Sequence, residues 1–82
     1  MTIEDAIGEL EDNENHFRFS RLLAICKDCF GEPRIVGSHH IFKTPWAGDP
    51  RINLQRDRAN AKPYQVRQVL RCLRRLKDRG VN

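Results

Sequence analysis

The sequence lacks any long apolar run. Its uncharged apolar stretches are only a few residues long, whereas a helix that crosses a bilayer needs about 20 residues. The N-terminus also lacks the basic segment followed by an apolar stretch that marks a secretory signal. We therefore expect no membrane partner and no secretion, and a cytoplasmic location.

Cysteines are few and odd in number, since the chain has only Cys26, Cys29 and Cys72. Together with the lack of a signal peptide, this favours reduced thiols over a disulfide framework.

The chain is also short. At 82 residues it buries only about 60% of the surface that its unfolded form exposes. This predicts one small core, with any chemistry on the surface of that core.

Basic residues are absent from positions 1–15, which contain six acids. Positions 16–82 contain all 15 basic residues against five acids, a formal charge of +10. We therefore divide the chain into an acidic N-terminal extension over 1–15 and a basic domain over 16–82. The extension is either a packing element or an acidic flap that lies against the basic domain. The charge of the domain suits a phosphate backbone, although it equally suits a solvated surface.

Three helices are predicted from apolar periodicity. Thr2 can cap a short first helix with Ile3, Ile7 and Leu10 on one face, and 11–15 is then a connector. A second helix is expected over Phe17–Phe30, closed by Gly31. Pro63 suits the first turn of a third helix. That helix has an apolar stripe of Val66, Val69, Leu70, Leu73 and Leu76, with arginines and a lysine around it.

The middle of the sequence has the pattern of strands. Residues 33–36 and 39–43 flank a Gly37-Ser38 turn, a loop rich in turn formers covers 44–50, and 51–55 alternates polar and apolar residues. The expected fold class is α+β. A three-stranded antiparallel sheet carries helices packed on one face, and its other face is open to a ligand or partner.

The most chemically suggestive residues are His39 and His40, directly after the turn. Period-2 counting puts His40 and Phe42 on one face, and His39, Ile41 and Lys43 on the other. With Ile41 in the core, the count makes His40 the exposed histidine, while a twisted strand end could expose His39. A histidine can take a proton from a ribose 2′-hydroxyl, and cations can stabilise the charge that develops on the phosphorane. Such a site needs no metal and no cofactor. The alternative is a hydrogen-bonding role at the strand edge.

A metal-dependent HNH-like nuclease is a further alternative, because Cys26-x-x-Cys29 precedes the histidine pair and Asn53 follows it, as a histidine base and an Asn do in that type of site. The pattern is incomplete, since no histidine and no second Cys-x-x-Cys follow His40. A structural zinc usually takes four ligands, which these residues do not readily supply.

A resemblance covers most of the chain, from about Arg18 to Leu76. The helix 19–30, the block Gly31-Glu-Pro-Arg-Ile-Val-Gly-Ser-His-His-Ile-Phe-Lys43, the strand 51–54 and Lys62-Pro-Tyr-Gln-Val-Arg-Gln-Val-Leu-Arg71 resemble the HicA family of toxin–antitoxin ribonucleases. The resemblance implies a double-stranded-RNA-binding-domain-like α-β-β-β-α fold, with the first predicted helix as a short addition. It also implies an mRNA interferase that inhibits translation and is itself inhibited by a HicB-type antitoxin. Residues 16–82 would form the ribonuclease domain.

The resemblance places the family's catalytic histidine on His39, with His40 as the alternative. We expect RNA contacts from Ser38, Lys43, Arg51, Lys62, Arg67 and Arg71. Phe42 and Trp46 could stack on unpaired bases, or Trp46 could cover the edge of the core. The chain departs from the family in two ways. It has no second histidine after the third strand, where many relatives have Val-Pro-x-His, and the acidic segment lies outside the usual core. A non-catalytic RNA-binding or antitoxin-binding module is the alternative function.

Overall fold

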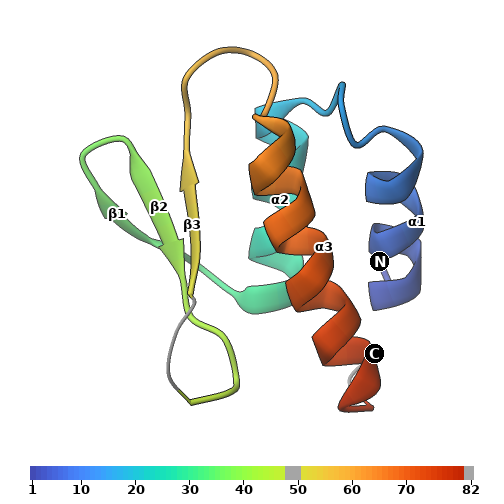
Figure 1. The fold of residues 1–82 in the computed structure, drawn as a ribbon. Helices are drawn as coiled ribbons and strands as arrows, with labels where there is room; N and C mark the ends of the chain where they lie inside the picture. The colour runs from blue at the N-terminus through green and yellow to red at the C-terminus, as the bar shows by residue number, and fades with distance from the viewer. Residues whose placement is uncertain (48–50, 81–82) are drawn as a thin grey trace.

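The computed structural model describes residues 1–47 and 51–80. It is an α+β fold with three helices and one three-stranded antiparallel sheet, as predicted (Figure 1). No helix in the described ranges is long and apolar enough to cross a membrane. The elements in chain order are α1 (Ile3–Asp12), α2 (Phe19–Phe30), β1 (Arg34–Val36), β2 (His39–Phe42), β3 (Ile52–Gln55) and α3 (Pro63–Asp78).

The sheet is a meander in the order β1-β2-β3. The predicted turn joins β1 to β2, and Gly37 adopts the positive φ of +59° that the first position of a type II′ turn needs. Val36 pairs with His39, and His39 pairs in turn with Gln55. The predicted loop over 44–50 connects β2 to β3, and its residues 48–50 lie outside the described part of the chain.

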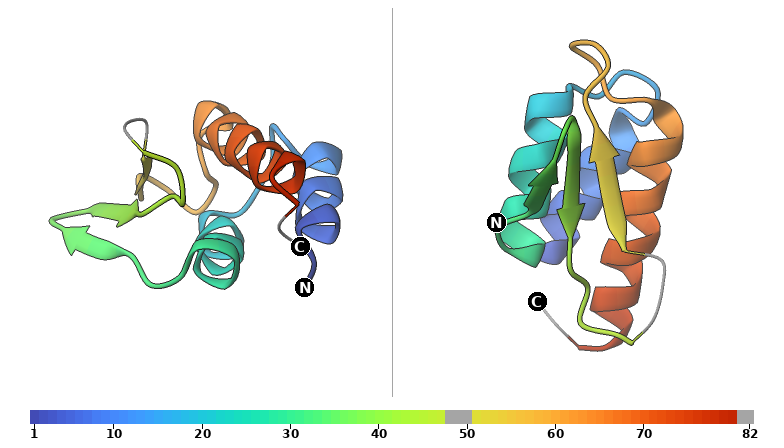
Figure 2. Two further views of the ribbon diagram at one scale, coloured as in Figure 1. Left: turned by 90° about the horizontal axis from the view of Figure 1, so that it is seen from below. Right: turned by 90° about the vertical axis from the view of Figure 1, so that its left-hand side faces the viewer.

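The molecule has three layers (Figure 2). Helices α2 and α3 lie side by side on one face of the sheet, and α1 lies behind them, on the side away from the strands. The core between the first two layers contains Phe42, Ile52 and Leu54 from the sheet, all with no exposed surface. The other face of the sheet carries no helix, which is the arrangement that the sequence predicted.

Helix α1 is an integral part of the core. Its first turn is closed by a capping box, in which the Asp5 amide donates to Thr2 Oγ1 at 3.1 Å and the Thr2 amide donates to Asp5 Oδ2 at 3.4 Å. Ile3 is 5% exposed, and Ala6 and Leu10 are fully buried. The helix continues to Asp12, so the expected connector over 11–15 begins two residues too early.

The acids of the N-terminal segment also pair with cations of the basic domain. The guanidinium of Arg21 donates to both carboxylate oxygens of Glu9, at 2.7 and 2.8 Å. Three further pairs join this segment to α3: Glu4–Lys77 at 3.0 Å, Glu11–Arg74 at 2.7 Å and Glu14–Arg67 at 3.8 Å. Exposed pairs contribute about 0–1 kcal/mol each. The segment is thus a packing element that also neutralises part of α3, and it is not a detachable flap.

Candidate functional site on the open face of the sheet

The open face is the face of the sheet that carries no helix. Because Phe42, Ile52 and Leu54 point into the core, the residues that alternate with them point away from it. Ile41 is only half-buried, so the expectation that it occupies the core was wrong: the larger Phe42 fills that position. His40 and Phe42 share one face as counted, but that face is the one toward the helices, so His39 and not His40 lies on the open face. The open face comprises Arg34, Val36, His39, Ile41, Lys43, Arg51, Asn53 and Gln55.

His39 lies at the turn end of this face and is held by a neighbouring strand. Its Nδ1 is 3.0 Å from Oδ1 of Asn53, and because an amide oxygen only accepts, Nδ1–H is the donor. This bond leaves Nε2 of the neutral imidazole as an acceptor. Beside this bond, Nε2 of Gln55 donates to Oγ of Ser38, the turn residue before His39, at 3.1 Å. Two cross-strand hydrogen bonds therefore fix the turn and the orientation of the His39 ring.

His40 points the other way, toward the helices. Its ring packs on Phe19 of α2, with the ring centroids 5.8 Å apart and the planes at 60°. Nδ1 of His40 is buried and has no hydrogen-bond partner within residues 1–47 and 51–80. The guanidinium of Arg56 also lies over the Phe19 ring, 4.7 Å from its centroid. Of the two predicted catalytic residues, only His39 lies on the face that carries the cations.

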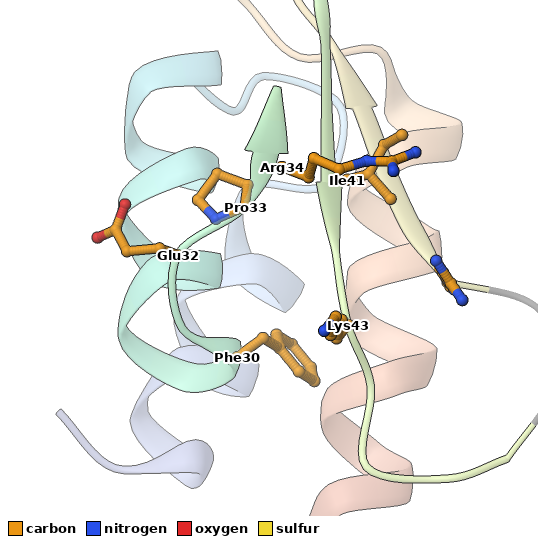
Figure 3. Close-up of a pocket in the computed structure, with 7 residues that line it drawn as sticks. Phe30, Glu32, Pro33, Arg34, Ile41 and Lys43 are labelled. Carbon is orange, nitrogen blue, oxygen red and sulfur yellow. The ribbon is translucent and has the colours of Figure 1, made fainter. Parts of the chain in front are cut away.

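A basic hollow occupies the opposite end of the open face. It has a volume of about 440 Å³ and is lined by Phe30, Glu32, Pro33, Arg34, Ile41, Lys43 and Arg51. Figure 3 shows the Arg34 side chain crossing over Ile41, while the carboxylate of Glu32 points away from it. Within the described ranges, none of the three cations Arg34, Lys43 and Arg51 forms an ion pair. We call the site of these three cations the basic hollow.

The other predicted RNA contacts lie on or near α3. Lys62 precedes the helix and is 3.7 Å from Asp57. Arg67 faces the N-terminal segment, 3.8 Å from Glu14. Arg71 lines a separate hollow of about 200 Å³ with Trp46, Gln68, Cys72 and Arg75. The structure thus brings Ser38, His39, Lys43 and Arg51 to one face and leaves Lys62, Arg67 and Arg71 on or beside α3.

The predicted aromatic stacking residues are not available to bases. Phe42 has no exposed surface, and Trp46 is 8% exposed. The Arg75 guanidinium covers the Trp46 ring, 4.3 Å from its centroid. Both side chains therefore serve the core, which for Trp46 was the alternative that the sequence left open.

Of the residues of the site, sequence reasoning considered Asn53 only as part of the incomplete HNH-like pattern, and it missed Gln55 and Arg34. The alternation in β3 does contain the signal for the first two, since Ile52 and Leu54 point inward and leave Asn53 and Gln55 on the opposite face. Nothing local predicts that Asn53 contacts His39, because the register of β2 with β3 depends on the long connection between them. The place of Arg34 on this face could have been predicted from the two-residue hairpin, because that hairpin puts Arg34 opposite Ile41.

The thiols take no part in the site. Burial raises the pKa of Cys26 and, to a lesser extent, the pKa values of Cys29 and Cys72. All three are free cysteines, and thiols of raised pKa are poor nucleophiles at neutral pH. In the ranges that the structure describes, no three His, Cys, Asp or Glu side chains gather as a potential metal site.

The open face combines an oriented imidazole, whose Nε2 has no partner in the part of the chain that the structure describes, with polar amides beside it and a cluster of cations at the far end. An acceptor nitrogen can remove a proton from a hydroxyl that binds there, and the cations can hold phosphate groups. No family model, curated protein or solved structure matches this chain.

Proposed function

We propose that the chain is a metal-independent endoribonuclease that uses His39 as its acid–base group. The observation that carries the proposal is the bond from His39 Nδ1–H to Asn53 Oδ1 at 3.0 Å, on the exposed and basic side of the sheet. It presents Nε2 to a ligand in one tautomer and one orientation. The bond occupies Nδ1 of His39 and leaves Nε2 as the acceptor nitrogen.

The proposed reaction needs only groups of the RNA and of this chain. Nε2 of His39 accepts the proton of a ribose 2′-hydroxyl, and the 2′-oxygen attacks the adjacent phosphorus. The bond from phosphorus to the 5′-oxygen breaks, and that oxygen takes up a proton from the imidazolium or from water. The products are a 2′,3′-cyclic phosphate and a 5′-hydroxyl. General acid–base catalysis of this kind contributes about 10²–10⁴-fold.

The resemblance to HicA toxins supports a more specific version of the proposal. The order α2-β1-β2-β3-α3 agrees with the double-stranded-RNA-binding-domain-like fold of that family. The Gly37-Ser38-His39 segment resembles the catalytic block of that family. We therefore propose a cytoplasmic mRNA interferase that inhibits translation, whose partner is a HicB-type antitoxin that covers the open face.

Induced expression tests this function. Wild type should arrest growth and degrade mRNA, and His39→Ala should do neither at the same protein level. His40→Ala is a poor control because its ring packs on Phe19. Arg74→Gln is better matched, since this exposed cation lies on α3 and pairs with Glu11. The control should remain toxic. Equal toxicity of His39→Ala would contradict the enzyme proposal, and RNA binding without cleavage by wild type would favour the non-catalytic RNA-binding module.

Co-expression with the neighbouring reading frame tests the antitoxin. A protein of that frame that co-purifies with the chain and restores growth would support the proposal. The bound partner should also protect the open face around His39 from chemical modification. A neighbour that neither binds nor restores growth would contradict the toxin–antitoxin assignment and leave the ribonuclease proposal to its own test.

A further inference from the structure

We infer that the basic hollow is a phosphate subsite separate from the reacting group, which binds a backbone phosphate several nucleotides from the bond that His39 cleaves. The RNA identity of the ligand rests on the proposed function. The separation of the two sites rests on the geometry of the sheet alone. The inference makes Arg34, Lys43 and Arg51 determinants of substrate length and affinity, not of the chemical step.

The distance along β2 separates the two sites. Lys43 follows His39 by four residues, which is about 13 Å at the rise of a strand. Arg51 adjoins β3 beside Lys43, because Phe42 pairs with Ile52. Side chains of a strand stand roughly perpendicular to the sheet, so Lys43 and Arg51 at this end and the imidazole at the other do not meet at one phosphate. At a rise of about 3.4 Å per stacked nucleotide, the separation spans about four nucleotides.

The charge distribution favours an anionic ligand in the hollow. Three cations line it, and within the described part of the chain none of them is paired with an acid. On α3 the opposite holds: Arg67, Arg74 and Lys77 are paired with acids of the N-terminal segment. Among the described residues, that segment therefore neutralises part of α3, although not Arg71 and Arg75, and it does not neutralise the cations of the basic hollow. Such a cluster of cations attracts and orients a polyanion.

The shape of the hollow suits one nucleotide. Its volume of about 440 Å³ lies within the range of small-ligand pockets. Phe30 and Ile41 are half-buried and contribute apolar surface, and Lys43 lies beside them (Figure 3). A base can lie on this surface while the cations hold its phosphate. Arg34 crosses from β1 over Ile41, and so its side chain lies over the same surface.

A subsite of this kind changes binding and leaves the chemical step unchanged. Removing its cations should raise KM with kcat unaffected, which is the signature of an interaction made equally in the ground state and the transition state. It should also weaken the salt dependence of binding. The logarithmic slope should fall by about 0.7 for each phosphate of a single strand that the protein no longer neutralises.

The test uses the full chain and two kinds of oligonucleotide. Binding is measured by fluorescence anisotropy on a 2′-O-methyl strand of about ten nucleotides, which cannot be cleaved and falls within typical single-strand site sizes. Cleavage is measured on strands that contain one ribonucleotide, with either the 5′ or the 3′ flank shortened. The variant is the triple substitution Arg34→Gln, Lys43→Gln, Arg51→Gln. The matched control replaces two paired cations of α3, Arg74→Gln and Lys77→Gln, and circular dichroism verifies that both variants fold.

The triple variant should raise Kd and KM about tenfold with kcat unchanged, and the control should match wild type. Shortening one of the two flanks should raise KM for wild type and have no effect on the triple variant. An unchanged Kd, or a fall in kcat at constant KM, would overturn the inference. So would a variant that binds RNA normally but no longer binds an acidic protein partner, because the hollow would then be a protein-docking site.

These results are separable from the test of His39. Weakened oligonucleotide binding in the triple variant, combined with full cleavage by His39→Ala, would support the subsite and contradict the proposed catalytic residue. Normal binding by the triple variant, combined with no cleavage by His39→Ala, would contradict the subsite and support His39 as the catalytic residue. If wild type does not bind the oligonucleotide, both proposals are wrong.

Discussion

Replacing Leu10 by alanine tests whether the acidic N-terminal segment belongs to the cooperative core. Leu10 has no exposed surface and lies in the cluster that joins α1 to the rest of the molecule. Removing a fully buried leucine side chain costs about 2–5 kcal/mol in the free energy of unfolding. A domain of this size has about 4–12 kcal/mol in total, so the variant should fold but with a large loss of stability.

The matched control on the same helix is Glu11→Gln, which removes an ion pair. Glu11 and Arg74 are about half exposed, at 48% and 52%, and such a pair contributes less than about 1 kcal/mol. Urea unfolding would be followed by far-UV circular dichroism and by the fluorescence of Trp46, the sole tryptophan. The two signals should give one coincident transition for every variant. A loss below about 1 kcal/mol for Leu10→Ala, or a helical signal that unfolds before Trp46 responds, would show that α1 is held mainly by charge.

Three other residues allow tests of individual contacts. The hydrogen bond from the Arg21 guanidinium lowers the pKa of Glu9 from its ordinary 4.5. This pair therefore stabilises the folded state above pH 4.5, and the stabilisation is lost as the pH falls through the lower pKa of the folded state. Glu9→Gln should therefore be less stable than wild type at neutral pH by under about 1 kcal/mol, and pH-dependent urea titrations should show this gap closing in acid. Burial raises the pKa of Cys26, so mass spectrometry should find it modified by a thiol reagent only when the protein unfolds; modification of the folded chain would contradict its placement. Gly37→Ala should lower the unfolding free energy by about 1 kcal/mol through the left-handed backbone alone, because an added Cβ meets no atom within 4 Å; a loss of several kcal/mol would point to a clash instead.

The order of elements and most of their boundaries follow from local signals. Thr2 and Pro63 mark the start of their helices by capping and by a fixed φ, and Gly37 marks the hairpin. The period-2 pattern of β2 was also predicted correctly, but the choice of the buried face was wrong. Ile41 and Phe42 are both apolar neighbours on a strand, so alternation alone does not decide which of them faces the helices.

The contacts of the site depend on parts of the chain far apart in sequence. The bond from His39 to Asn53 spans 14 positions and requires the register of β2 with β3. The pairing of Glu11 with Arg74 spans 63 positions. The uneven distribution of acids and bases predicts that the segments attract, but only the packing of Leu10 and its neighbours determines which pairs form. Within residues 1–47 and 51–80, the cations of the basic hollow form no ion pair, and the acids of α1 lie on the other side of the molecule.

The most direct test of the central claim is the rate of cleavage of one RNA substrate by purified chain in EDTA, with the product ends identified by mass spectrometry. Wild type should give 2′,3′-cyclic phosphate ends, and the rate for His39→Ala should be about 10²–10⁴-fold lower. Asn53→Ala should give a smaller loss, because the ring keeps its position on β2 but loses its fixed orientation. Cleavage by His39→Ala at the wild-type rate, or cleavage by wild type that EDTA abolishes, would contradict the claim that this imidazole is the acid–base group of a metal-independent ribonuclease.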